Sequence, residues 1–302
     1  MSASPAPLRV HTHCRPELGI AIHRVAHALA AYAPSWVQPV PPSQPADFQV
    51  IHMLGDGERV PAEALPLHTF AIVQYMVRTT ETPYIVSWGP LWSRAAAVWS
   101  YYDLEALARE DGTPLVYTDT IYHAPLGVDA TIFRPCGCSH KYLVGTSGYV
   151  ASTESVDEWY QVVLRKGARQ FHLGPDLLHA PFATVEHRVG LTDREVAKAW
   201  GQCQYVSGLR RIEGFEFPAA EGLLCGSRPV LFDRPHYREW FGSWAEYIPE
   251  GDPQETVAAL LALVNQPYRR VTEAERTAAM LRFHWPTLVQ EFWAVVARSL
   301  GR

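Results

Sequence analysis

Two glutamates, Glu213 and Glu221, bracket a short segment that could bind a polar ligand. Pro218 fits the first position of a helix, because the N–H that proline lacks has no helical partner there. Gly226 suits the position just past the end of that helix, and residues 228–233 then predict a buried strand. The free N–H groups and the dipole of such a helix start favour an anion. Glu221 is expected on the first turn, where its carboxylate can accept hydrogen bonds from sugar or ribose hydroxyls.

This segment, EGFEFPAAEGLLCGSRPVLF from Glu213 onward, resembles the E-x7-E motif of family-4 retaining glycosyltransferases, which is usually written EGFGLPALEAMACGTPVI. It departs from the motif at Glu216, where the family has glycine. Other family segments are matched in the same order along the chain. They are the first glycine loop and helix (19–29), the domain junction (126–129 and 133–135), a late helix start (251–260) and the opening of a final helix (282–285).

The resemblance implies an α/β protein of the GT-B fold, with two doubly wound, Rossmann-like domains and a cleft between them. Residues 1–135 would form the acceptor-side domain, residues 140–285 the nucleotide-sugar-binding domain, and residues 286–302 a helix crossing back to the N-terminal domain. Hydrophobic periodicity independently predicts alternating strands and helices, which is typical of parallel sheets. The predicted strands are 8–12, 47–54, 70–77, 97–100, 142–145, 169–174 and 204–207, and the predicted helices 20–32, 104–109, 156–166, 193–200 and 286–300.

Composition sets broad limits on the function. The chain has 302 residues, of which 48% are hydrophobic, enough for two domains with substantial cores. A net charge of −5 argues against a broad basic surface for nucleic acid. No apolar run reaches the length of a bilayer span, and residues 1–7 lack the apolar core of a signal peptide. We therefore expect a cytoplasmic protein with no transmembrane segment.

The cysteines predict no disulfide framework. Cys136 and Cys138, followed by His140, raise the question of a metal site. Their spacing is shorter than that of zinc knuckles and no second pair accompanies them, so an irregular linker between domains is the favoured interpretation. The remaining cysteines are Cys14, Cys203 and Cys225.

By the resemblance, the second domain would hold the donor. Glu221 would bind the ribose hydroxyls, and Glu213 would contact the transferred sugar. Backbone N–H groups of residues 214–217 would orient sugar and phosphate, while Gly19 would let the backbone of the first domain approach the diphosphate. The donor-binding candidates are Glu221, Gly214, Phe215, Glu216, Phe217, Gly19, Gly148 and Tyr149.

The family's basic pair in the loop after the second domain's first strand is missing. Tyr149 stands where the family has arginine, and Glu154 where it has lysine. Arg210 and Arg211 could neutralise the diphosphate instead, and only one of them should face the cleft because alternate residues of an extended segment point opposite ways. With Glu213 they are the catalytic candidates. No Asp-x-Asp motif follows a strand, so we expect no metal and no cofactor beyond the nucleotide-diphosphate sugar as co-substrate.

Four residues in or after strand-like segments of the first domain are acceptor-side candidates. Two are histidines, although a single histidine is more often structural than functional. Tyr75 and Arg78 lie at the end of one predicted strand. The full set is His52, Tyr75, Arg78 and His123.

The resulting hypothesis is a retaining, metal-independent glycosyltransferase that moves a sugar from a nucleotide sugar to an unidentified acceptor, either a glycan or a small molecule. Two alternatives stay open. The departures at Tyr149, Glu154 and Glu216 are compatible with a non-catalytic GT-B-like binding protein. The acceptor could also be a modified DNA base of the phage type, which the acidic pI of about 6.2 does not favour.

Overall fold

The computed structural model describes residues 6–13, 20–54, 63–75, 85–110, 119–148, 154–174, 184–211 and 215–302. Its contacts group the chain into two compact units. The first contains Met1–Gly127 and Trp285–Arg302, and the second contains Val128–Ile212 and Glu216–His284. Five of the predicted site residues lie outside the described residues: Gly19, Arg78, Tyr149, Glu213 and Gly214.

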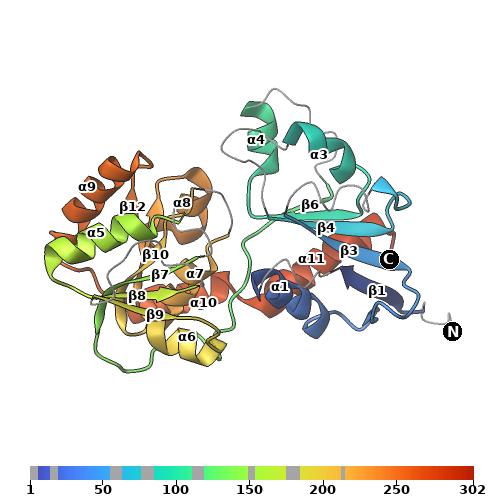
Figure 1. Ribbon diagram of the computed structural model, residues 1–302. Coiled ribbons are helices and arrows are strands. Elements are labelled where there is room, and N and C mark those ends of the chain that lie inside the picture. The colour runs from blue at the N-terminus through green and yellow to red at the C-terminus, as the bar shows by residue number, and fades with distance from the viewer. Residues whose placement is uncertain are drawn as a thin grey trace. The chain divides into compact units, whose positions relative to one another are not determined.

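The described strands of the first unit form one parallel sheet in the order β2-β1-β3-β4-β5-β6 (Figure 1). Every residue of β4 and β5 is buried, so both faces of the sheet need cover. The strands are β1 (Leu8–His13), β2 (Val37–Pro39), β3 (Phe48–Met53), β4 (Phe70–Gln74), β5 (Ala97–Ser100) and β6 (Ile121–His123), and the helices α1 (Ile20–Ala31), α3 (Ile85–Trp92), α4 (Leu104–Glu110) and α11 (Trp285–Ser299).

Helix α11 belongs to the first unit although it follows the second unit in the chain. The indole N–H of Trp293 donates to the carbonyl of Leu29 in α1 at 3.3 Å. The Phe292 ring lies 5.4 Å from the ring of Trp99 on β5. The C-terminal helix therefore crosses back and packs beside α1 on the sheet, as predicted.

The second unit holds another parallel sheet, in the order β12-β11-β10-β7-β8-β9. Helices α5 and α9 pack together over one face, and α7 packs on β10 and β11 with α6 and α10 beside it. The strands are β7 (Tyr142–Ser147), β8 (Gln170–Leu173), β9 (Val185–Arg188), β10 (Cys203–Gly208), β11 (Arg228–Phe232) and β12 (Glu246–Ile248), and the helices α5 (Val156–Lys166), α6 (Asp193–Trp200), α7 (Phe217–Cys225), α8 (Pro235–Phe241), α9 (Pro253–Val264) and α10 (Glu273–Arg282).

The hydrophobic core of the second unit lies between its sheet and the α5–α9 pair. Trp159 of α5 is fully buried there, and its ring stacks 6.2 Å from that of Tyr205 on β10.

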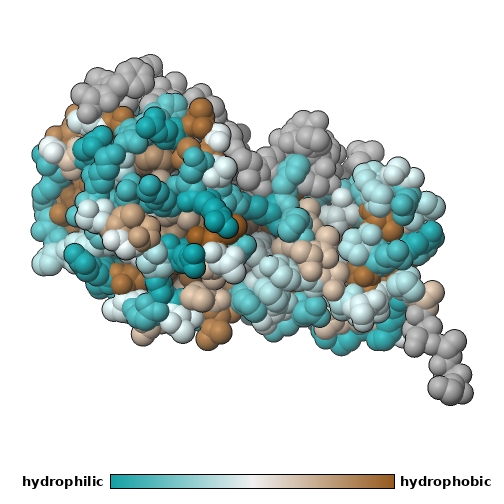
Figure 2. Space-filling model, turned by 90° about the horizontal axis from the view of Figure 1, so that it is seen from below, coloured by the Kyte–Doolittle hydropathy of each residue, from teal (hydrophilic) through white to brown (hydrophobic). Residues whose placement is uncertain are grey.

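Polar side chains cover much of the face that Figure 2 shows, with smaller hydrophobic areas between them. Within the described ranges, no helix has the length and apolar character needed to cross a bilayer.

Most predicted elements are confirmed. Strand 97–100 and helix 156–166 have the predicted bounds. The capping box at Thr192 forms, with its hydroxyl accepting from the Glu195 N–H. The sequence analysis did not identify β2, because it occupies only three residues where the proline-rich loop was expected to begin.

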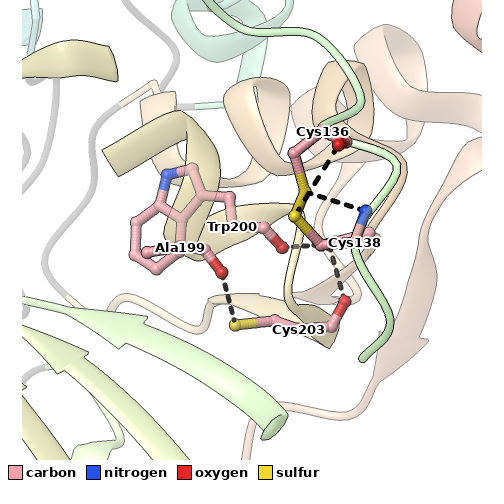
Figure 3. Close-up of a disulfide and its surroundings, with 6 residues drawn as sticks. Cys136, Cys138, Ala199, Trp200 and Cys203 are labelled. Atoms are coloured by element: carbon pink, nitrogen blue, oxygen red, sulfur yellow. Dashed lines mark hydrogen bonds between the residues drawn. A yellow bond between two sulfur atoms is a disulfide. The ribbon is translucent and has the colours of Figure 1, made fainter. Parts of the chain in front are cut away.

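A local disulfide joins Cys136 to Cys138, where the sequence analysis predicted only an irregular linker (Figure 3). It closes a loop around a single glycine, so it constrains the chain locally and provides no framework. Cys203 and Cys225 are free and buried, and burial raises the pKa of both thiols, which keeps them protonated. Cys14 lies outside the described residues.

Close packing of α7 on β10 leads to a first prediction. A Cβ at Gly222 would lie 2.7 Å from the Cβ of Val206, closer than carbon atoms can approach. Helix propensity alone would make Gly222→Ala stabilising by about 1 kcal/mol. We expect it to be destabilising by about 1–3 kcal/mol instead, because the helix must move off the sheet. Urea unfolding of the two proteins measures the difference.

Ala258→Gly is the matched control, because Ala258 is exposed in the interior of α9. It should cost only the propensity difference of about 1 kcal/mol. A Gly222→Ala protein as stable as the wild type or more so would contradict the packing argument.

Candidate functional site

The strand order of the second unit fixes where a ligand can bind. The chain runs from β7 outward to β8 and β9, then returns to the other side of β7 for β10, β11 and β12. The loops that follow β7 and β10 therefore leave the same edge of the sheet in opposite directions. Ligands of open α/β sheets bind in the crevice at such a reversal. We define the residues after these two strands, Gly148, Glu154, Arg210 and Glu216, as the switch-point site of the second unit.

Helix α7 starts in this site. It begins at Phe217, with Glu216 as the flanking residue, and ends before Gly226, whose φ of 96° is left-handed as predicted. Pro218 is thus the second helical residue, not the first as predicted. Glu221 is the fifth residue, so its predicted place in the first turn is wrong. Both positions differ from the prediction because the helix begins one residue earlier, at the buried Phe217.

Glu221 lies inside the second unit with only 3% of its surface exposed. Its Oε2 accepts a hydrogen bond from the indole N–H of Trp200, the last residue of α6, at 3.1 Å. This carboxylate therefore ties α6 to α7. Sequence reasoning did not find this structural contact, since nothing in the motif indicates which tryptophan α7 meets.

Arg210 lies between two carboxylates, and we call this group the Arg210 triad. The guanidinium contacts Glu154 Oε1 at 3.1 Å and Glu216 Oε1 at 3.2 Å. The side chains of Glu154 and Glu216 are 7% and 2% exposed, whereas that of Arg210 is 31% exposed. The hydroxyl of Tyr237 on α8 also donates to Glu216 Oε1, at 3.3 Å. Two buried carboxylates thus share one arginine that solvent can reach.

Burial raises the pKa of Glu216 to about 7. The charge of Glu154 raises this pKa as well, while Arg210 and the Tyr237 hydroxyl lower it. Glu216 therefore changes its charge near neutral pH, in contrast to an ordinary carboxyl group.

Arg211 points away from the triad. It binds Glu158 of α5 at 3.0 Å and the Thr256 hydroxyl of α9 at 3.2 Å, and its guanidinium lies 5.4 Å from the centre of the Phe232 ring. These contacts hold α5 and α9 together over the core. The two adjacent arginines diverge as alternation predicts, and Arg210 is the one at the switch-point site.

The remaining predicted donor residues fall in different places. Gly148 lies beneath the triad, and any side chain there would overlap the carboxylate of Glu154. Phe217 is buried at the start of α7. Phe215 is grouped by its contacts with the first unit.

The first unit has its own reversal, between β1 and β3. His52, on β3, is 1% exposed and its Nδ1 lies 2.7 Å from the hydroxyl of Tyr75. Burial lowers the pKa of His52 to about 3, so the imidazole is neutral. The hydroxyl of Tyr101 donates to the carbonyl of Tyr75. The structure thus brings His52 and Tyr75 together, whereas His123 ends β6, two strands away from β4.

His11 and His13 of β1 line a pocket beside α1. Their rings lie 4.5 Å apart, and His13 Nε2 is hydrogen-bonded to Gln49 Oε1. The sequence analysis did not select this pair, although two histidines with one residue between them at a strand end give a recognisable signal. The pocket measures about 330 Å³ and is lined by Val10, His11, Thr12, His13, Ala26, Ala30, Pro39, Val40 and Pro42. Across the described ranges, no three or more histidine, cysteine or acidic side chains gather as metal ligands would.

Several solved structures that match this chain are GT-B glycosyltransferases, and the chain has the GT-B fold. Sucrose-phosphate synthase from Thermosynechococcus elongatus matches with a TM-score of 0.73 and 8% identity, over 98% of this chain and 100% of that chain. Anabaena HepE in complex with UDP and glucose gives 0.72 and 14%, over 96% and 100%. AviGT4, a glycosyltransferase involved in avilamycin A biosynthesis, gives 0.66 and 16%, over 98% of both chains.

No family model matches the sequence, and no curated protein does. At identities this low, the structural matches establish the fold and leave the activity to be argued from the site.

The raised pKa of Glu216 predicts a pH dependence of stability. An unfolded glutamate titrates near 4.5, whereas folded Glu216 titrates at about 7. Between these values the folded protein holds a proton that the unfolded chain releases, so the stability contributed by this group falls as pH rises. From pH 4.5 to 7.5, the unfolding free energy of wild type should therefore fall by up to about 3 kcal/mol more than that of Glu216→Gln. Denaturant unfolding at several pH values measures it.

Glu246→Gln is the control, because Glu246, on β12, pairs with Arg269 and lies outside the triad. Equal pH profiles for wild type and Glu216→Gln would show that Glu216 titrates like an ordinary carboxyl group.

Proposed function

We propose that this protein is a retaining glycosyltransferase that moves a sugar from a nucleotide-sugar donor to an acceptor hydroxyl without a metal ion. One observation carries the proposal. Helix α7, which contains the second glutamate of the E-x7-E motif, starts at the switch-point site of the second unit in a GT-B fold. HepE, which shares this fold, has been solved in complex with UDP and glucose, and this supports a nucleotide-sugar donor.

The donor's diphosphate would lie at the start of α7. Backbone N–H groups there, together with the helix dipole, stabilise negative charge. Arg210 pairs with Glu216, the residue just before α7, and would stabilise the negative charge that develops on the leaving diphosphate. Arg211 is assigned a structural role, because Glu158 and α9 hold its guanidinium.

Transfer would break the bond between the sugar's anomeric carbon and the diphosphate oxygen and form a bond to the acceptor oxygen on the same face. The acceptor's proton would pass to the leaving phosphate. We assign the acceptor side to the first unit, where neutral His52 and the Tyr75 hydroxyl offer hydrogen-bonding groups beside the reversal of the sheet. Glu213 would contact the transferred sugar, as the resemblance implies.

A nucleotide-sugar screen tests the function directly. We expect one of UDP-, GDP- and ADP-glucose to raise the melting temperature, because a ligand that binds only the folded state stabilises it. The same donor should then be hydrolysed slowly or transferred, with release of nucleoside diphosphate measured by chromatography. Binding with no turnover across a panel of acceptors would favour a GT-B-like binding protein.

The screen includes a chelation arm. Activity should persist in EDTA, because protein groups are proposed to neutralise the leaving group. Activity that disappears in EDTA and returns with Mn²⁺ or Mg²⁺ would contradict metal independence.

The ribose contact proposed for Glu221 makes a further prediction. We expect Glu221→Ala to weaken donor binding by about 10- to 100-fold, the scale of losing hydrogen bonds to a charged acceptor. The same change also removes the partner of the buried Trp200 N–H, so the variant should unfold more easily. Calorimetric titration with the selected donor, at a temperature where the variant is folded, measures the affinity.

Glu221→Gln separates the two effects. It keeps a carbonyl acceptor for Trp200 and should restore most of the stability, but it lacks the charge that strengthens ribose hydrogen bonds. Wild-type affinity in both folded variants would remove Glu221 from the donor site.

A further inference from the structure

Arg210 is not free to receive a diphosphate in the form the structure shows. Its guanidinium is already paired with Glu154 and Glu216, both almost wholly buried. Two carboxylates sharing one arginine leave a net negative charge in the triad. A donor diphosphate brings further negative charge to the same site, where the burial of both carboxylates strengthens repulsion. Donor binding at this site therefore needs a way to remove one of the carboxylate charges.

We propose that the donor's diphosphate replaces the carboxylate of Glu216 on Arg210, and that Glu216 takes up one proton from solvent when the donor binds. This inference rests on the proposed function and specifies how the same site accepts its substrate. The only bond formed in the exchange is the O–H bond of Glu216, whose proton comes from solvent. Glu216 then remains buried as a neutral acid, and Arg210 pairs with the diphosphate instead. Glu154 keeps its contact and holds Arg210 in place.

The surroundings of Glu216 favour it over Glu154 as the group that gains the proton. Glu216 is the more deeply buried of the two, at 2% against 7% exposed. Its side chain makes no capping hydrogen bond to α7, so protonation costs no helix cap. The Tyr237 hydroxyl, 3.3 Å from Oε1, can hydrogen-bond to either the charged or the neutral form.

The charged and titratable groups that face Glu216 come from each neighbouring element. Arg210 follows β10, Glu154 precedes α5, Tyr237 lies on α8, and Arg234 stands just before α8. Arg234 is paired with Glu250 at 2.8 Å and donates to the Arg211 carbonyl, so its guanidinium is held beside the triad by other partners. Burial, together with the charge of Glu154, raises the pKa of Glu216 to about 7, although Arg210, Tyr237 and Arg234 lower it. A proton is therefore available to Glu216 near neutral pH.

Proton-linked binding has a measurable signature. UDP-, GDP- and ADP-glucose have no group that titrates near neutral pH, so they serve as probes. We expect the affinity of wild type for the best of them to fall about tenfold per pH unit above pH 7, with little change below pH 6. Calorimetry at pH 8 in two buffers of different ionisation enthalpy should show uptake of nearly one proton per donor bound.

Glu216→Gln is the decisive variant because it mimics the neutral acid at every pH. Its affinity should be flat from pH 6 to 8.5, should match wild type at pH 6, and should involve no proton uptake. Glu246→Gln, which changes a glutamate outside the triad, should keep the wild-type slope. If Glu216→Gln does not fold, the two-buffer measurement on wild type still decides the question.

The outcomes separate the two proposals. A wild-type protein that binds a nucleotide sugar with a flat pH profile and no proton uptake overturns the exchange and leaves the proposed function intact. A slope that persists in Glu216→Gln assigns the proton elsewhere and also overturns it. If wild type and Glu216→Gln bind none of the three probes at any pH, the proposed function fails, and the exchange at this site fails with it.

Discussion

The chemistry of the second unit depends on one arginine that must satisfy two buried carboxylates. Arg210 offsets the cost of burying Glu154 and Glu216, because a buried carboxylate without a partner is strongly destabilising. The same arginine is the cation that the switch-point site presents to solvent. Under the proposed function, the need to stabilise the folded chain and the need to bind the donor's diphosphate compete for a single guanidinium. The charge of Glu154, which follows β7, therefore affects the charge of Glu216, which precedes α7, through the arginine that they share.

The strand order of the parallel sheet brings Glu154 and Arg210 together. Because β7 and β10 are neighbours in the sheet but lie on either side of the chain reversal, their following loops start side by side and then diverge. Glu154 and Arg210, more than fifty residues apart in sequence, contact each other for this reason. Arg211, one residue further on, turns to α9 and helps to hold the sheet's cover. The alternation of the backbone thus directs Arg210 to the triad and Arg211 to its contacts with α5 and α9.

The first unit shows a different solution to burying polar groups. His52 carries no charge, and its contact with the Tyr75 hydroxyl needs no ion pair. A neutral imidazole and a hydroxyl suit an uncharged ligand, such as a sugar or another polyol, whereas the second unit combines charges that suit a phosphate. The His52–Tyr75 pair is thus neutral, whereas the Arg210 triad is charged.

The sequence by itself determined the fold class, most elements and the position of the E-x7-E segment. The GT-B fold and the E-x7-E segment came from the resemblance to family-4 glycosyltransferases. The alternating strands and helices rest on local signals: hydrophobic periodicity, the capping box at Thr192 and the glycine that ends α7. It also predicted that Arg210 and Arg211 diverge, since alternation is a property of the backbone. Only the tertiary structure decided which partners they meet. The Glu221–Trp200 bond, the pairing of Arg210 with Glu154 and Glu216, and the His52–Tyr75 contact all join residues from different elements. Such contacts follow from strand order and helix packing, for which a single sequence contains no local signal.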